Sequence, residues 1–205
     1  METVILGAGD FGKQLLQHFT EQSINIKIVG WFDDSYKAGS LIEKLPCLGG
    51  ISSKDTFSNS YNYILALGYK SMAIKEQIFN VLVASNCDVI NFVHNSVVIS
   101  KSAKIGQGVN IYAGSIVDLN VTLADGVVLN NNVVVSHDSN VGCFSFLGPG
   151  VIACGNVNIG KRCFIGAGTV IKDGVDICDD VIIGSGTNIY KNITAPGVYT
   201  NNKKK

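Results

Sequence analysis

Several features that reveal function in other proteins are missing from this sequence. Its 16 basic and 16 acidic residues cancel to a formal net charge of zero, which removes any electrostatic case for a nucleic-acid or anionic-membrane partner. The opening stretch METVILGAG is too short an apolar run for a signal peptide or a membrane helix, and no longer run follows. We therefore expect a cytoplasmic protein that contacts neither nucleic acid nor membrane.

Metal-binding and disulfide patterns are also missing. The six cysteines form no CxxC pair and do not cluster with the three histidines. Scattered cysteines in such a chain indicate reduced thiols in a cytoplasm, and no set of residues predicts a metal site.

The length and apolar content limit the architecture. With 205 residues the chain has room for one or two domains with a substantial core. An apolar share of 46% is high for a soluble monomer, so we expect part of the surface to be buried between subunits. The terminal NNKKK is expected to be solvated and frayed.

Residues 1–92 alternate between strand and helix patterns. The expected elements are a strand at 3–6, a helix from the GAGDFG loop (7–12) to about 22, strands at 26–32 and 63–68, and a helix at 71–85 with Ser71 as N-cap. This order predicts a small Rossmann-like α/β domain with about three parallel strands, too short for a complete dinucleotide fold.

A period of six residues replaces the helical period from about residue 94. Stepping by six from Ile99 to Ile189 gives sixteen positions, of which fifteen are Ile, Leu or Val and one is Ala153. A second series two residues earlier is mostly Val, Ser, Thr or Cys. Such a repeat predicts a β-solenoid of hexapeptides over 93–193, followed by a tail at 194–205.

The same period predicts corners that lie on three edges of a triangular prism. Two inward positions two residues apart fit a strand, but the next lies four residues on, so the chain must turn between them. Three corners make a coil of eighteen residues, and about five coils stack at roughly 4.8 Å. His137 is then a corner residue whose side chain points outward, with Gly155 one coil along on the same edge.

Taken together, these segments resemble the left-handed parallel β-helix acyltransferases, and more narrowly bacterial nucleotide-sugar and sialic-acid acetyltransferases with a Rossmann-like N-terminal domain. The resemblance is carried by VILGAGDFG, VGWFDD, LPCLGG, LALG, the hexads and NNNVVVSHDSNVGCFSFLGPGVIACGNVNIG. It implies the left-handed coil, since the general crossover rule favours the opposite hand. It also implies a homotrimer with acetyl-CoA in grooves between neighbouring prisms.

The resemblance assigns roles to residues of the solenoid. His137 matches the proposed general base of relatives and Asp138 its acidic neighbour, and imidazole titrates in the range that a base at neutral pH requires. The spacing of eighteen makes the Gly155 N–H a candidate donor to the thioester oxygen. Ala167 and Ser185 match positions whose backbone contacts pantetheine, and Asn130 matches an asparagine near the sugar. Structural roles are expected for His18 and His94.

The glycine loop has two interpretations. GxGxxG with Asp33 some twenty residues later fits an NAD fingerprint, but the domain lacks a second mononucleotide half. A helix N-terminus can cradle any pyrophosphate, and the resemblance implies a nucleotide-sugar. The expected substrate-binding residues are Gly7, Gly9, Asp10, Phe11, Gly12, Lys13, Asp33, Asp34, Leu67 and Gly68.

We therefore expect an acetyl-CoA-dependent N-acetyltransferase. Its acceptor would be the 4-amino group of a dTDP- or UDP-linked 4-amino-4,6-dideoxyhexose, made for a bacterial surface polysaccharide or glycan such as the lipopolysaccharide O-antigen. Two alternatives stay open: O-acetylation of a sialic-acid-type sugar, and a non-catalytic scaffold that binds nucleotide-sugars. A single-domain dehydrogenase is the weakest of the interpretations.

Overall fold

The computed structural model describes residues 2–22, 26–52, 57–200 and 203–204. The chain divides into two compact units, Met1–Asn91 and Phe92–Lys205, and each is described by itself. Among the described residues, no helix is long and apolar enough to cross a membrane. None of the six cysteines forms a disulfide.

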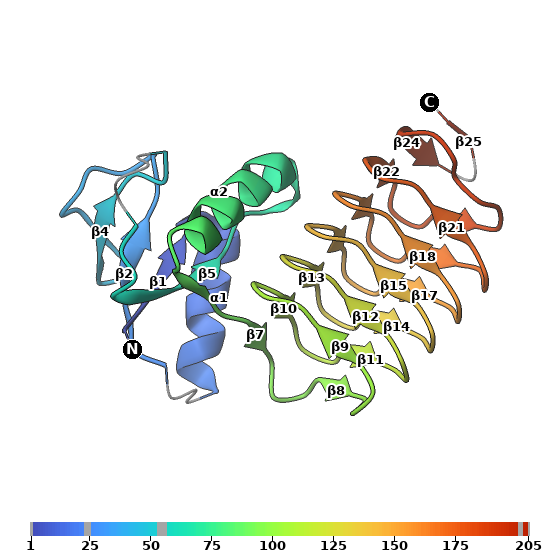
Figure 1. Ribbon diagram of the computed structural model, residues 1–205, viewed down its shortest axis with the longest axis horizontal. Helices are drawn as coiled ribbons and strands as arrows, with labels where there is room; N and C mark the ends of the chain where they lie inside the picture. The colour runs from blue at the N-terminus through green and yellow to red at the C-terminus, as the bar shows by residue number, and fades with distance from the viewer. Residues whose placement is uncertain (1, 23–25, 53–56, 201–202, 205) are drawn as a thin grey trace. The chain divides into compact units, whose positions relative to one another are not determined.

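The first unit contains one six-stranded sheet (Figure 1). Its strand order is β3-β4-β2-β1-β5-β6. The strands are β1 (Glu2–Leu6), β2 (Ile28–Phe32), β3 (Leu41–Ile42), β4 (Leu45–Gly49), β5 (Tyr61–Leu65) and β6 (Asp88–Val89). All neighbours pair in parallel except β3 and β4, which form an antiparallel hairpin.

The expectation of about three parallel strands in this unit is wrong, because five strands run parallel. The additional strands β4 and β6 are hard to recognise from sequence. β4 contains Pro46, which normally argues against a strand, and β6 has only two residues. The LPCLGG segment therefore extends the sheet beside β2.

The helices of the first unit are α1 (Asp10–Glu21), η1 (Tyr69–Ser71) and α2 (Met72–Ala84). In α1, Leu15 and Phe19 are buried at a spacing of four, as expected for a helix with one apolar face. Ser71 is the N-cap residue of α2, as expected, but its side chain makes no capping hydrogen bond.

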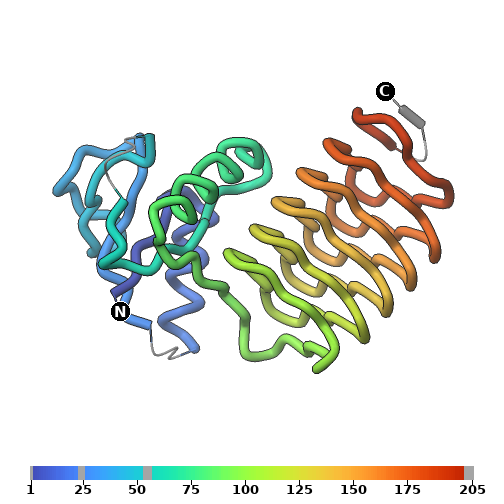
Figure 2. The backbone as a smooth tube through the Cα atoms, in the orientation of Figure 1, coloured from blue at the N-terminus to red at the C-terminus, as the bar shows by residue number. Residues whose placement is uncertain are grey.

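The second unit is a β-solenoid whose successive coils follow one another regularly along the chain (Figure 2). The coils add short strands to three sheets, in which neighbouring strands pair in parallel except for the terminal pair β24 and β25. The first solenoid sheet contains β7 (Phe92–Val93), β10 (Asn110–Ile111), β13 (Val128–Leu129), β16 (Phe146–Leu147), β19 (Phe164–Ile165), β22 (Val181–Ile183), β24 (Gly197–Thr200) and β25 (Lys203–Lys204). The second contains β8 (Val98–Ile99), β11 (Ile116–Val117), β14 (Val134–Val135), β17 (Ile152–Ala153), β20 (Val170–Ile171) and β23 (Asn188–Ile189). The third contains β9 (Lys104–Ile105), β12 (Thr122–Leu123), β15 (Asn140–Val141), β18 (Asn158–Ile159) and β21 (Asp176–Ile177).

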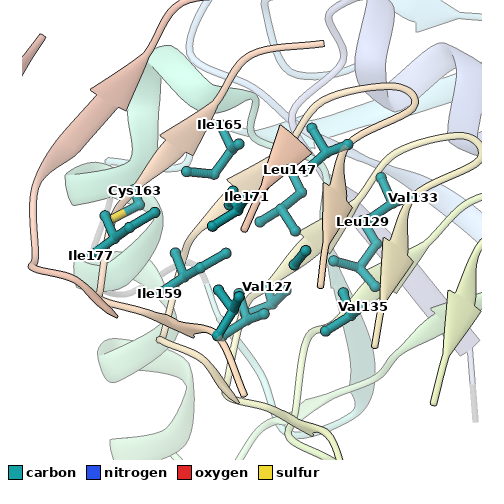
Figure 3. Packing of buried hydrophobic residues seen from close by; sticks show 14 of the residues in the cluster. Val127, Leu129, Val133, Val135, Leu147, Ile159, Cys163, Ile165, Ile171 and Ile177 are labelled. Carbon is teal, nitrogen blue, oxygen red and sulfur yellow. The ribbon is translucent and has the colours of Figure 1, made fainter. Parts of the chain in front are cut away.

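Stacked strands are paired eighteen residues apart, which confirms the predicted coil length. In the second solenoid sheet, for example, Val117 pairs with Val135 and Val135 with Ala153. The hexad side chains fill the interior and point toward one another (Figure 3). The last coil is shorter, because Val181 pairs with Gly197 only sixteen residues on.

The C-terminal segment is only partly described. Gly197–Thr200, which the sequence analysis assigns to a tail, form β24 and pair in parallel with β22. Lys203–Lys204 form β25, whereas the rest of the NNKKK segment (201, 202 and 205) lies outside the described residues.

Buried hydroxyls in the second hexad series link successive coils. The Ser139 Oγ donates to the Cys154 carbonyl (3.0 Å) and accepts from the Val157 N–H (3.0 Å). The Ser145 Oγ makes the equivalent pair of bonds to Gly160 and Cys163. These side chains can be buried because both their donor and acceptor capacity is used.

Every sixth residue from Gly108 to Gly186 has a left-handed backbone, with φ between 51° and 73°. Each of these fourteen residues comes directly after a corner residue, as Asp138 follows His137. Seven are Gly, three are Asn (Asn120, Asn132, Asn156), two are Asp (Asp138, Asp180), and the others are Phe144 and Arg162. Gly, Asn and Asp prevail because they tolerate positive φ at the lowest cost.

The outer faces of the solenoid sheets differ in chemistry. The second solenoid sheet carries an aliphatic column that includes Val98, 62% exposed, Ile116, 40% exposed, and Ile152, 39% exposed. The third carries polar side chains, with Asn140 and Asn158 joined by an amide hydrogen bond of 2.8 Å.

Candidate active site

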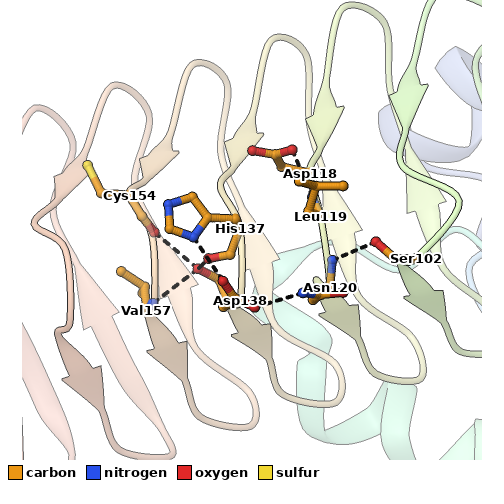
Figure 4. A network of polar contacts seen from close by, with 9 residues as sticks. Ser102, Asp118, Leu119, Asn120, His137, Asp138, Cys154 and Val157 are labelled. Atoms are coloured by element: carbon orange, nitrogen blue, oxygen red, sulfur yellow. Dashed lines mark hydrogen bonds and ion pairs between the residues drawn. The ribbon is translucent and has the colours of Figure 1, made fainter.

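His137 lies at a corner between the second and third solenoid sheets, and its side chain is 50% exposed (Figure 4). The prediction of an outward-pointing corner residue is therefore confirmed. Leu119 lies on the same edge one coil before His137, and Gly155 lies there one coil after it. Two backbone hydrogen bonds of 2.9 Å connect these coils: the Asp138 N–H donates to the Leu119 carbonyl, and the Asn156 N–H donates to the His137 carbonyl. We call this edge of the prism the His137 edge.

Asp138 contacts the ring of His137 directly. The imidazole Nδ1 lies 3.0 Å from Asp138 Oδ2. Because an ionised carboxylate only accepts hydrogen bonds, Nδ1 carries the proton and Nε2 is left with its lone pair. The other carboxylate oxygen, Oδ1, accepts from Asn120 Nδ2 at 3.0 Å (Figure 4). Asp138 thus fixes the tautomer that a general base needs.

The electrostatics of the pair favour charge on both groups. The hydrogen bond to Asp138 raises the pKa of His137 above its ordinary value of 6.5. Desolvation acts in the opposite direction, and the charges of Asp138, Asp118 and Asp173 add to the increase. Hydrogen bonds from Asn120 and then from His137 lower the pKa of Asp138. His137 is therefore a stronger base than an isolated histidine, but it is protonated up to a higher pH.

Gly155 lies directly against the free side of the imidazole. A Cβ at residue 155 would be 2.6 Å from both Cε1 and Nε2 of His137 and 2.8 Å from Asp173 Oδ1. Only glycine leaves this space open. Within the part of the chain that the structure describes, the Gly155 N–H donates to no acceptor. The structure thus places an available N–H one coil from His137, at the spacing the sequence predicts.

Ala167 and Ser185 stack on a different edge, which also contains Asn131 and Pro149 and which we call the Ala167 edge. Their backbone N–H groups have no hydrogen-bond acceptor among the described residues. The corner N–H of Lys161, by contrast, donates to Asp179 Oδ1 at 2.8 Å. Both amides on the Ala167 edge are therefore available to an outside acceptor.

Asn130 also lies at the Ala167 edge, and a side of the prism containing β14 separates it from His137. Its Oδ1 accepts from the Asn131 N–H at 2.7 Å. The folded chain thus gathers His137, Asp138 and Gly155 at one edge, but it does not bring Asn130, Ala167 or Ser185 to that edge.

The glycine loop of the first unit follows β1 at the carboxyl edge of its sheet. Gly9 is the N-cap residue of α1, and Gly7 has a φ of 103°. A Cβ at Gly12 would collide with the Gly7 carbonyl, so the loop and the helix approach too closely for a side chain. Gly7 and Gly12 of the GxGxxG pattern therefore have structural reasons that hold for any ligand.

Asp33 and Asp34 follow β2 at the same edge, and both make hydrogen bonds to the chain. Asp33 Oδ2 accepts from the Ala8 N–H at 2.7 Å, which ties the glycine loop to β2. Asp34 accepts from the N–H (3.1 Å) and Oγ (2.7 Å) of Ser52, and these bonds lower the pKa of the Asp34 carboxyl. In the fold, the two carboxylates therefore hold neighbouring loops in place through these hydrogen bonds.

A cavity of about 460 Å³ opens beside these aspartates within the first unit. Three of the expected substrate-binding residues line it: Asp33, Asp34 and Leu67. The other lining residues were not predicted from the sequence; they are Ser35, Ile51, Ser52, Phe57, Ser71, Ile74, Gln77, Ile78 and Val81. Four of them come from α2 and lie on one face of the helix, because they are three or four residues apart: Ile74, Gln77, Ile78 and Val81. This spacing is the sequence signal from which they could have been predicted.

The cavity lining does not include the other expected substrate-binding residues of this unit, within the part of the chain that the structure describes. These residues are Gly7, Gly9, Asp10, Phe11, Gly12, Lys13 and Gly68. A Cβ at Gly9 or Gly68 would meet no atom within 4 Å, so the backbone is open at both positions. In the described part of the chain, no group of three His, Cys, Asp or Glu residues has the geometry of a metal site.

The sequence matches three families of known proteins. Residues 2–82 match the PglD N-terminal domain, residues 95–137 match the hexapeptide repeat of succinyl-transferase, and residues 138–173 and 156–191 match the bacterial transferase hexapeptide (six repeats). Together these matches span both units.

Similar solved structures cover the whole chain. The acetyltransferase domain of PglB from Neisseria gonorrhoeae FA1090, in complex with acetyl coenzyme A, is 26% identical with a TM-score of 0.89 over 100% of this chain and 98% of that chain. PerB from Caulobacter crescentus, in complex with CoA and GDP-perosamine, is 22% identical with a TM-score of 0.88 over 100% and 97%. WeeI from Acinetobacter baumannii AYE shares the fold at 19% identity, with a TM-score of 0.71 over 100% and 99%.

The fold and its corners define an acyltransferase built from hexapeptide repeats. The match to the PglD N-terminal domain, the matches to hexapeptide repeats of bacterial transferases and the shared fold of the PglB acetyltransferase domain confirm the predicted resemblance to the left-handed β-helix acyltransferases that carry such an N-terminal domain.

Proposed function

We propose that this protein transfers an acetyl group from acetyl-CoA to the amino group of a nucleotide-linked amino sugar. The observation that carries the proposal is the geometry at Gly155, where only the missing side chain leaves space beside Nε2 of His137 and the backbone N–H has no acceptor among the described residues. A base and an oxyanion donor on neighbouring coils are what acyl transfer to an amine requires. The PglB domain, bound to acetyl coenzyme A, supports the choice of donor.

In the proposed reaction His137 accepts the proton of the attacking amine. When bound, acetyl-CoA supplies an acetyl thioester. The amine nitrogen forms a bond to the acetyl carbon, its proton passes to Nε2, and Asp138 stabilises the imidazolium through Nδ1. The Gly155 N–H stabilises the negative charge on the carbonyl oxygen. As the C–S bond breaks, the leaving sulfur takes the proton from Nε2, and His137 returns to its neutral form.

A second copy of the chain would complete this site. Ala167 and Ser185, the candidate pantetheine contacts, and Asn130, the candidate sugar contact, lie on the Ala167 edge and not beside His137. In a homotrimer with acetyl-CoA between neighbouring prisms, the Ala167 edge of one subunit faces the His137 edge of the next. The exposed aliphatic column of the second solenoid sheet supports a subunit interface, since such a surface favours burial.

The first unit would bind the nucleotide part of the acceptor. The glycine loop, with Gly7, Gly9, Asp10, Phe11, Gly12 and Lys13, offers a helix N-terminus to a pyrophosphate. The cavity beside Asp33, Asp34 and Leu67, with Gly68 following, opens at the carboxyl ends of β2 and β5, where ligands of parallel sheets bind. PerB, which binds GDP-perosamine, supports a nucleotide-linked 4-amino-4,6-dideoxyhexose as the acceptor.

An assay of thiol release from acetyl-CoA tests the function directly. The protein is offered UDP-, dTDP- and GDP-linked 4-amino sugars and, separately, free sialic acid. We expect release of CoA with at least one nucleotide-amino sugar and none with sialic acid. Turnover of sialic acid alone would favour O-acetylation, and turnover of no acceptor would leave a binding scaffold. We also expect His137→Ala to lower kcat by about 10²-fold or more.

A further inference from the structure

Asn120 lies on the His137 edge, one coil before Asp138, and contacts it through its side chain. Asn120 Nδ2 donates to Asp138 Oδ1 at 3.0 Å, while Asp138 Oδ2 lies 3.0 Å from His137 Nδ1. The two oxygens of one carboxylate are thus shared between an amide on one side and the imidazole on the other (Figure 4).

Asp138 needs an external partner to hold this orientation. Its side chain is 49% exposed, and an exposed carboxylate on a corner residue is free to change rotamer. Only the orientation in which Oδ2 meets Nδ1 fixes the proton of His137 on Nδ1 and leaves Nε2 as a base. A donor fixed against Oδ1 restricts the carboxylate to that orientation.

Asn120 is itself held in place by the stacked coils. Its backbone N–H donates to Ser102 Oγ at 2.9 Å, on the coil before it. On the coil after it, the Asp138 N–H donates to the Leu119 carbonyl at 2.9 Å, which keeps the two corners in register. The chain of contacts Ser102–Asn120–Asp138–His137 therefore runs along three successive coils.

The backbone alone does not account for this asparagine. Asn120 occupies one of the left-handed corner positions, with a φ of 57°, and half of those fourteen positions are glycine. Glycine would meet the conformational requirement equally well. What asparagine adds at residue 120 is the amide donor. Asn132, at a corner of the Ala167 edge with a φ of 58°, does not donate to Asp138 in the described structure and gives a matched comparison.

We propose that Asn120 is a positioning residue, which orients Asp138 so that His137 presents its unprotonated Nε2 to the acceptor amine. This inference rests on the proposed function for its consequence in catalysis, although its structural consequence at His137 does not depend on the acceptor.

The electrostatics agree with this role. The hydrogen bond from Asn120 is the largest cause of the lowered pKa of Asp138, so the amide also keeps the carboxylate ionised. The charged groups that act on His137 are Asp138, Asp118 and Asp173, and all three raise its pKa. Of these, only Asp138 makes a hydrogen bond with the ring.

The test compares Asn120→Gly with Asn132→Gly in the full-length protein by NMR of the histidine side chains. Because the chain has only three histidines, the His137 signals are identified by their loss in His137→Ala. In Asn120→Gly we expect the His137 pKa to fall toward its ordinary value and the neutral ring to shift from the Nδ1–H toward the Nε2–H tautomer. Asn132→Gly should leave both unchanged. An Asn120→Gly spectrum identical to wild type in pKa and tautomer would overturn the inference.

Kinetics with the acceptor found by the thiol-release assay give the second readout. Asn120→Gly should lower kcat by about 10-fold with little change in KM for either substrate, as expected when an interaction acts on the base and not on binding. Asn120→Asp, which keeps the size of the side chain but replaces the donor by an acceptor, should lower kcat at least as much. A wild-type kcat in Asn120→Asp would contradict a donor role. Absence of activity in the wild type would refute the proposed function and leave the NMR result standing.

Discussion

His137 differs from an ordinary surface histidine in having a distinct neighbour on each side of its ring. Asp138 accepts a hydrogen bond at Nδ1, and the space left by Gly155 opens at Nε2. In the neutral ring, Nδ1 is thereby fixed as a donor, and Nε2 is left unprotonated beside an open space.

The open space at Gly155 leads to a prediction for Gly155→Ala. The new Cβ would lie 2.6 Å from His137 Nε2, so the ring must move or rotate away from the reacting position. We expect kcat to fall by about 10²-fold, comparable to the loss of one oxyanion donor. In a His137→Ala background the same substitution should lower kcat no further, because its effect acts through the ring. Additive losses in the double variant would contradict this mechanism.

The pH dependence of the reaction should report the His137–Asp138 pair. A general base must be neutral, so kcat/KM should rise with pH through the pKa of His137, which Asp138 holds above 6.5. In Asp138→Asn the pKa falls, and the acidic limb of the profile should move to lower pH while the plateau decreases, because the base is weaker. Asp180→Asn, the same change at an equivalent corner that faces Arg162, is the control and should leave the limb in place. An unshifted limb in Asp138→Asn would count against the pair.

At the scale of the element, each hexad is a strand of about two residues and a corner that ends in a left-handed residue. The corner imposes positive φ whatever the side chain, as Phe144 (61°) and Arg162 (51°) demonstrate. Stacking eighteen residues apart supplies the hydrogen bonds that keep these costly conformations in place.

Asn132 allows this cost to be measured away from the His137 edge. At a φ of 58°, Asn132→Ala should reduce the free energy of unfolding by about 1 kcal/mol, since alanine tolerates the left-handed region poorly. Asn132→Gly should change stability much less, because glycine adopts this φ freely. Thermal unfolding followed by circular dichroism compares the two, and an alanine variant as stable as the glycine variant would show that the corner does not impose this cost.

At the scale of the whole molecule, the proposed site depends on assembly. The residues expected to bind acetyl-CoA lie on an edge that a single chain does not bring to His137. Catalysis and oligomerisation should therefore be lost together when the interface is disrupted.

Ile152→Glu places a charge in the aliphatic column of the second solenoid sheet, at a residue that is 39% exposed. By light scattering, we expect the wild-type protein to have three times its chain mass of 21.8 kDa. The variant should dissociate and lose acetyl transfer. Thr122→Glu, on the polar outer face of the third solenoid sheet, is the control and should remain assembled. A trimeric and active Ile152→Glu would exclude this face as the interface.

Much of this architecture could be predicted because the repeat is local and regular. The hexad side chains had to face inward at each step, so the coil length, the edges and the outward direction of His137 followed from counting residues. The alignment of Gly155 with His137 followed from the same count. Strands β4 and β6 were missed because a proline and a length of two residues hide them from pattern analysis.

The six-residue period of the chain thus established the solenoid and its corners and aligned Gly155 with His137, because in a regular repeat the position along the chain specifies the position in space. The candidate role of His137 as base came from the resemblance and not from the period. Only the folded chain decided which side-chain atoms meet. It showed that Asp33 holds the glycine loop, that Asn120 shares the Asp138 carboxylate with His137, and that a cavity opens beside α2. These contacts depend on rotamers and on loops without a period, which the order of residues does not specify.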